Sequence, residues 1–131
     1  MPWTKIPPGS AHCATASSVT DARRGQLWLL DLGEPVGHEQ GWTRPALIVS
    51  SDRWNRHAST VTVLPLTRTR HDLPTRVEIE PDALNGLDAT SYARCEDIRS
   101  ISERRLVHTI GRVDPIVMAT VTRTLTLFLR D

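Results

Sequence analysis

Short apolar segments bounded by glycine and proline most constrain what this chain can fold into. Residues 26–32 are nearly all apolar and lie between Gly25 and Gly33, and residues 46–50 form a second segment of the same kind. Segments of this length and composition are typical of strands buried on both faces. Of the 131 residues 39% are hydrophobic, which is enough for one modest core, so we expect a single domain. A domain this small is marginally stable alone, which favours association with a partner.

Alternating segments predict further strands. Residues 60–66 predict a third strand, in which Pro65 requires an end, a bulge or an edge because proline cannot donate a ladder hydrogen bond. Residues 75–80 predict a half-exposed strand with Val77 and Ile79 pointing inward. After a turn at Asn85-Gly86, more strand is expected over residues 90–94, 96–101 and 106–113, the last bulged at Gly111.

Two segments predict helix. Residues 51–58 fit a short helix or turn capped by Ser51 or Asp52. Asp114-Pro115 is a typical cap and first-turn pair, so residues 114–129 are interpreted as a helix, although their C-terminal half also alternates like a strand. One face of that helix would carry Val117, Val121, Leu125 and Phe128. The sum is a mainly β fold with α, a small barrel with a C-terminal helix.

The remaining segments have no hydrophobic period. Residues 1–22 are rich in Pro, Ser, Thr and Ala, and we expect a disordered or loosely packed extension before a folded domain at 23–131. A docking arm is the functional alternative for this extension. Residues 33–45 hold three glycines and two prolines and predict a long loop, a kind of segment that is usually functional or mobile.

Charge and cysteine content limit the class of protein only weakly. The formal net charge is +1, but residues 52–76 hold five arginines and two aspartates. This surplus of positive charge either attracts phosphate or is a solvated face.

Cys13 and Cys95 match no metal or redox spacing, so we expect reduced thiols in a cytoplasmic protein. We expect neither a metal nor a cofactor. No apolar run approaches membrane-spanning length, and Pro7, Pro8 and Gly9 interrupt the N-terminus where a secretion signal would be apolar.

An ordered series of motifs carries the most specific signal. Arg24-Gly25 opens the first strand, Gly37-His38-Glu39-Gln40-Gly41 follows in the loop, and Arg44-Pro45 leads into the second strand. The series continues with Pro65-Leu66-Thr67, Arg76-Val77-Glu78-Ile79, Ser91-Tyr92-Ala93, Glu96-Asp97-Ile98-Arg99-Ser100-Ile101 and Ile110-Gly111-Arg112-Val113. Over about residues 23–131 the chain thereby resembles the MazF/PemK family of type II toxin–antitoxin toxins.

This resemblance implies a fold, an activity and partners. The fold is a small SH3-like (CcdB/PemK-type) barrel with a C-terminal helix, as a homodimer. The activity is metal-independent, sequence-specific cutting of single-stranded RNA; the candidate targets are messenger RNA and also ribosomal or transfer RNA, and which class is the main target is left open. A cognate antitoxin would neutralise the toxin by covering residues 33–43 and the groove beside them. Two departures are the first 22 residues, which shorter members lack, and Trp42, where small or polar residues are common.

The resemblance also implies a catalytic pair, Arg44 and Thr67, with Glu39-Gln40 in the loop. Metal-free cleavage uses the 2′-hydroxyl of the RNA to attack the adjacent phosphorus, giving 2′,3′-cyclic phosphate and 5′-hydroxyl ends. Arginine suits the phosphorane because its planar fork holds two phosphate oxygens. The alternative for Arg44 is a surface arginine paired with Glu39 or Glu34. The alternative for Thr67 is an ordinary strand threonine without a catalytic role.

The residue that takes the 2′-proton is left open. Glu39 is the nearest carboxylate in sequence, so it is a candidate base or substrate orienter. His38 and His71 titrate in a useful range. RNA contacts are expected from the loop and from the residues after the third strand, namely His38, Gln40, Trp42, Arg68, Arg70 and His71.

Trp28 is interpreted as a core residue and Trp54 as a core residue or a dimer contact. Toxins of the same fold that inhibit DNA gyrase form a second hypothesis. They depend on a tryptophan near the C-terminus, whereas this chain ends in Leu127-Phe128-Leu129-Arg130-Asp131. A nucleic-acid-binding barrel without turnover is a third hypothesis.

Overall fold

The computed structural model describes residues 21–33 and 43–131, and the fold is given for these residues. Strands make up most of this part of the chain, together with two short 3₁₀ turns and two helices. In chain order the elements are β1 (Gln26–Asp31), β2 (Thr43–Ile48), α2 (Asp52–His57), β3 (Thr60–Thr67), β4 (Arg76–Ile79), β5 (Ser91–Arg94), η1 (Cys95–Asp97), β6 (Arg99–Ser102), η2 (Glu103–Arg105), β7 (Leu106–Arg112) and α3 (Pro115–Leu129). The predicted mainly β fold with a C-terminal helix is confirmed.

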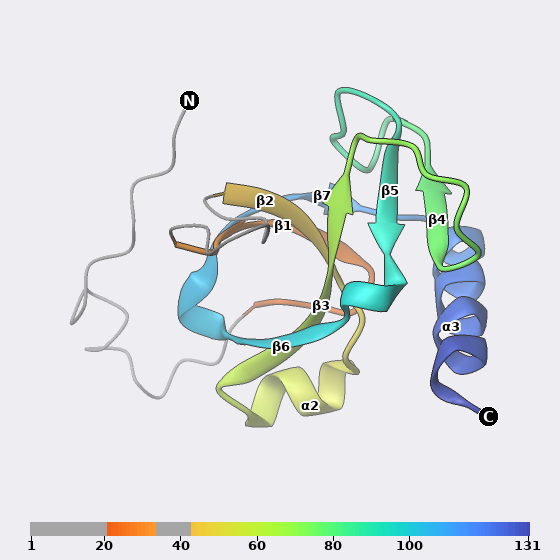
Figure 1. Cartoon of the computed structure of the whole chain (residues 1–131). Helices are drawn as coiled ribbons and strands as arrows, with labels where there is room; N and C mark the ends of the chain where they lie inside the picture. Colours follow the sequence, from red (N-terminus) through yellow and green to blue (C-terminus); the bar gives the residue numbers. More distant parts are fainter. Residues whose placement is uncertain (1–20, 34–42) are drawn as a thin grey trace.

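The strands form one antiparallel sheet with the order β4-β5-β3-β2-β1-β7, and β6 pairs with β3 beside β5. Figure 1 shows β1, β2, β3, β6 and β7 curving around a common centre, with β4 and β5 standing next to α3. Within the described residues no ladder joins β7 to β4 or β6, so the sheet curves but is not a closed barrel, and that part of the prediction is wrong. The chain passes from β6 to β7 through η2, a 3₁₀ turn.

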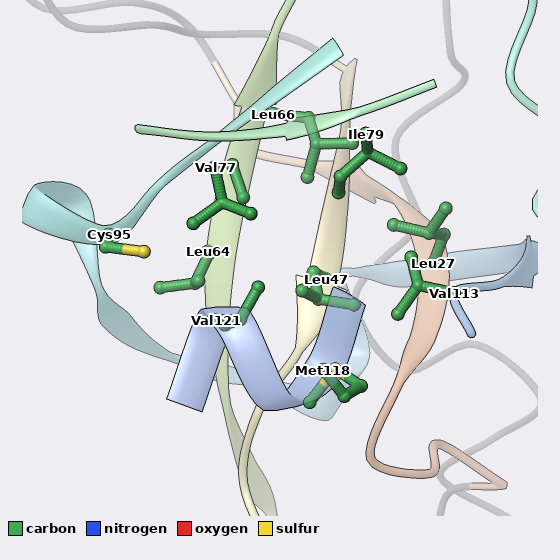
Figure 2. Packing of buried hydrophobic residues seen from close by; sticks show 11 residues of the cluster. Leu27, Leu47, Leu64, Leu66, Val77, Ile79, Cys95, Val113, Met118 and Val121 are labelled. Atoms are coloured by element: carbon green, nitrogen blue, oxygen red, sulfur yellow. The ribbon is translucent and has the colours of Figure 1, made fainter. Parts of the chain in front are cut away.

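Two apolar clusters lie on the two faces of this sheet. Side chains alternate along a strand, so Ala46 and Ile48 of β2 point to one face and Leu47 to the other. The α3-side cluster includes Leu27, Leu47, Leu64, Leu66, Val77, Ile79, Ala93, Cys95, Val113, Met118 and Val121. Figure 2 shows Met118 and Val121 of α3 directed at Leu47 and Leu64 of the sheet. The inner cluster includes Ala22, Leu30, Ala46, Ile48, Val61, Val63, Ile101 and Leu106.

The C-terminal segment is a helix, as predicted, and the alternative strand is excluded. Asp114 caps it by accepting a hydrogen bond from the backbone N–H of Val117 at 2.8 Å, and Pro115 occupies the first turn. The threonines fit because four of them bond back to the carbonyl four residues earlier, namely Thr120, Thr122, Thr124 and Thr126. Of the predicted apolar face, Phe128 is exposed.

The strand pairing is irregular at Pro65 of β3 and near Gly111 of β7, for different reasons. On one side of β3, the ladder with β6 covers Thr60–Val63 and the ladder with β5 begins at Leu66, so Pro65 lies in the gap between them. In β7, the register against β1 shifts next to Gly111, which confirms the predicted bulge. Proline and glycine therefore stand where the ladders change.

The two described tryptophans differ. Trp28 is half-buried against the inner cluster and donates from Nε1 to Oε1 of Gln26 at 2.9 Å, which supports its assignment to the core. Trp54 is 53% exposed on α2, so it is not a core residue. In Figure 1 one end of β3 lies beside α2 and the other end lies beside β5. Trp54 belongs to α2 and Thr67 is the last residue of β3, so the two residues lie near opposite ends of this strand.

Candidate active site

Arg44 lies inside β2, where it is paired with Leu30 of β1. The predicted loop over residues 33–45 is therefore wrong for its last three residues, because β2 begins at Thr43. Residues 43–45 have a composition typical of turns, but they are extended because they pair with β1. Arg44 is half-buried and makes no ion pair with any residue in the described ranges.

Thr67 is the last residue of β3 and is 8% exposed. Its Oγ1 accepts a hydrogen bond from the backbone N–H of Thr69 at 3.2 Å. Because the oxygen is held by this bond, the hydroxyl hydrogen is left to donate elsewhere. The strand end thus presents an oriented donor.

Arg44 and Thr67 lie on the same face of the sheet. Residues 44, 46 and 48 alternate to the inner-cluster face of β2, and residues 61, 63, 65 and 67 do so on β3. The β2–β3 ladder aligns Ala46 with Pro65, and the same register continued by two residues aligns Arg44 with Thr67. Directly opposed side chains of antiparallel strands have Cβ atoms roughly 4.5–5.5 Å apart. On this register the two side chains would lie on neighbouring strands at one end of the inner cluster.

The other expected RNA-contact residues divide into two groups. Arg68, Arg70 and His71 follow Thr67 on the surface and are exposed. Arg68 pairs with Asp88 at 3.6 Å and Arg70 with Asp72 at 3.4 Å, both as exposed pairs that contribute little to stability. The loop residues His38, Glu39, Gln40 and Trp42 lie outside the described residues.

Next to Thr67 the structure places residues that the sequence analysis did not select. Tyr92 of β5 is paired with Thr67, and Arg94 lies two residues further on the same face. Arg94 Nη2 pairs with Asp97 Oδ2 at 2.7 Å, and Arg76 Nε pairs with Glu96 Oε2 at 2.7 Å. The alternation of residues 91–94 indicates that Tyr92 and Arg94 avoid the core, but only the β3–β5 pairing shows that they flank Thr67.

Glu96 is the acidic centre of this group. Burial raises its pKa, but hydrogen bonds from its own backbone, Arg76 and Thr75, and the charge of Arg76, outweigh burial and hold the pKa below the usual 4.5. Cys95 beside it is fully buried, and burial, with the Glu96 charge, raises the pKa of its thiol to about 11. The thiol is therefore protonated at neutral pH and is not a nucleophile.

The lowered pKa of Glu96 gives stability that acid removes. Because the folded-state pKa lies below the unfolded one, the stabilisation is complete above the unfolded pKa and is lost as the pH falls through the folded value. We expect Glu96→Gln to flatten the dependence of the free energy of unfolding on pH between about pH 5 and pH 3. Urea unfolding at several pH values measures this slope. Exposed Glu78→Gln is the control, and a Glu96→Gln slope equal to that of the unmodified protein would contradict the prediction.

Two further observations describe what this part of the chain contains. Among the described residues, no group of three His, Cys, Asp or Glu side chains is arranged to hold a metal ion. None of the described helices has the length and apolar character needed to cross a membrane.

Comparison with known proteins places the chain in a family. Residues 23–129 match the family described as PemK-like, MazF-like toxin of type II toxin-antitoxin system. The chain is 35% identical to "Endoribonuclease MazF9" of Mycobacterium tuberculosis over 112 residues, which cover 82% of this chain and 95% of that protein. It is also 35% identical to "Endoribonuclease EndoA" of Bacillus subtilis over 109 residues, which cover 82% of this chain and 93% of that protein.

The fold has the same relatives. A solved structure titled "Endoribonuclease in complex with its cognate antitoxin from Mycobacterial species" superposes with a TM-score of 0.69 at 31% identity, covering 84% of this chain and 98% of that one. The curved sheet, the terminal helix and the match over nearly all of the described residues agree. The chain belongs to the PemK-like, MazF-like toxins of type II toxin–antitoxin systems.

Proposed function

We propose that this toxin is a metal-independent endoribonuclease that cuts single-stranded RNA at specific sequences. The observation that carries the proposal is that Arg44 and Thr67 alternate to the same face of the neighbouring strands β2 and β3, whose register, continued past Ala46 and Pro65, would set them opposite each other. Its relatives named as endoribonucleases support the same activity. We propose messenger RNA, and also ribosomal or transfer RNA, as substrates, and cytoplasmic action.

The chemistry follows from what each group can donate. The 2′-hydroxyl of the RNA loses its proton and attacks the adjacent phosphorus, and the bond to the 5′-oxygen of the next nucleotide breaks as that oxygen takes up a proton. Arg44 donates two parallel hydrogen bonds to the non-bridging oxygens of the phosphorane, which carry the developing charge. The Thr67 hydroxyl donates to the same phosphate, since its oxygen already accepts from Thr69. Glu39 is proposed as the group that takes the 2′-proton or orients the substrate.

The remaining expected RNA contacts are proposed around this pair. His38, Gln40 and Trp42 would act from the loop, and Arg68, Arg70 and His71 from the exposed segment after Thr67. The arginines there are held only by exposed ion pairs, which phosphates can replace.

We expect the purified protein to cut a long single-stranded RNA in the presence of excess chelator. The products should carry 2′,3′-cyclic phosphate and 5′-hydroxyl ends, which end-specific labelling distinguishes, and the mapped ends give the sequence preference. Protein with Arg44→Ala, purified in the same way, is the control against a contaminating ribonuclease. Cutting that stops when metal is removed would contradict the mechanism.

Two partners are proposed. A homodimer is supported by the large apolar side chains exposed on α3, namely Ile116, Leu127, Phe128 and Leu129. A cognate antitoxin is supported by the complex of a relative with its antitoxin. We propose that its segment covers residues 33–43 and the groove beside them, so that RNA cannot reach Arg44. The gyrase-inhibiting alternative has no feature in its favour, since no tryptophan lies near the end of α3.

A further inference from the structure

Tyr92 occupies a defined place beside the proposed catalytic pair. It is paired with Thr67 of β3 on one side and with Glu78 of β4 on the other. Its strand neighbour Ala93 is buried in the α3-side cluster, so Tyr92 points to the opposite face, the one that carries Thr67 and Arg44. Neighbouring strands lie roughly 4.8 Å apart, so Tyr92 is one strand from Thr67 and two from Arg44.

Among the described residues, Tyr92 makes no polar interaction that would explain its place. The side chain is half-buried, and its hydroxyl makes no hydrogen bond to any residue in the described ranges. On the same face Arg94 pairs with Asp97 and Arg76 pairs with Glu96, so these two arginines are already neutralised by carboxylates. Next to them, the Tyr92 ring offers a ligand a flat aromatic surface.

We propose that Tyr92 is a stacking platform for the nucleobase next to the phosphate held by Arg44 and Thr67. Proteins that bind single-stranded RNA combine phosphate donors with aromatic rings on which splayed bases stack. The other described aromatic side chains are Trp28, Trp54 and Phe128, of which Trp28 packs on the inner cluster and the other two lie on helices. Tyr92 is therefore the one aromatic residue among the described positions that is paired with the candidate catalytic threonine.

The inference rests on the proposed nuclease function and is tested by binding, which needs no reaction. The probe is a 2′-O-methylated oligonucleotide of the mapped cut sequence, since the methyl group blocks the nucleophile. Tyr92→Leu should weaken its binding about tenfold, because stacking contributes about 1–3 kcal/mol per base, and Tyr92→Phe should bind within about twofold of the unmodified protein. The Leu variant should raise KM on cleavable RNA much more than it lowers kcat.

Each outcome separates the stacking role from other roles. Equal binding by Tyr92→Leu and the unmodified protein would overturn the proposal while leaving the nuclease function intact. A fall in kcat at unchanged binding would also overturn it, because that result means only that Tyr92 positions Thr67. If the protein cuts no RNA, the proposed function fails, and 2′-O-methylated oligouridylate and oligoadenylate replace the mapped sequence in the same binding comparison. Thermal unfolding of both variants verifies that each is folded.

Discussion

Replacing Arg44 with alanine is expected to lower the rate of RNA cleavage by about 10²–10³-fold while the protein stays folded. Arg44 is half-buried near the end of the inner cluster and forms no ion pair within the described ranges. Under the proposed mechanism its removal therefore deletes a donor to the phosphorane without breaking an ion pair among the described residues. Single-turnover cleavage of a labelled RNA measures the rate, and thermal unfolding checks the fold.

Two variants separate the arrangement of donors from the positive charge. Arg44→Lys keeps the charge but cannot make two parallel hydrogen bonds, so its rate should fall between those of the unmodified protein and Arg44→Ala. Arg56→Ala removes an exposed arginine of α2, beyond the opposite end of β2, and should cut RNA nearly normally. A rate for Arg44→Ala close to that of Arg56→Ala would remove Arg44 from the mechanism.

Local sequence patterns predicted most of the elements because their causes are local. The cap at Asp114, the alternation of residues 76–79 and the apolar run of β1 each act within one element. The extent of the loop before β2 was misjudged because Arg44 and Pro45 look like loop residues and become strand only through pairing with Leu30 and Leu29. The open sheet was missed for the same reason, since closure depends on which strand edges meet.

The candidate site also combines residues that the sequence indicated with residues whose place depends on strand pairing. The resemblance selected Arg44 and Thr67, and the strand register explains why a residue early in β2 and one at the end of β3 can act together. Tyr92 and the ion-paired residues around Glu96 belong to the motifs that carry the resemblance, but nothing in those motifs shows that they lie next to Thr67. Their position depends on the strands that pair with β3, which are β6 before Pro65 and β5 after it. This pairing belongs to the tertiary structure and cannot be predicted from a single sequence.

Replacing Gly111 with alanine is expected to destabilise the fold by about 3 kcal/mol, the upper end of the roughly 1–3 kcal/mol that added atoms in a well-packed site typically cost. A Cβ at this position would lie 2.4 Å from the carbonyl oxygen of Leu84 and 2.5 Å from the carbonyl carbon of Asn85. Both are backbone atoms, and the N–H of Arg112 donates to the same Leu84 oxygen at 3.0 Å. The turn must therefore move off β7, breaking that hydrogen bond.

Gly33→Ala is the matched control because its strain has a different origin. Gly33 has a φ of 75°, which an L-residue adopts at a cost of about 1 kcal/mol, but among the described residues its added Cβ would meet only the Arg105 guanidinium, at 3.8 Å. Gly111 has no such φ, so its cost is contact alone. Thermal unfolding should show a Tm roughly 10 °C lower for Gly111→Ala, with a smaller shift for Gly33→Ala. Equal shifts would mean that the turn at residues 84–86 yields easily and does not fix the bulge of β7.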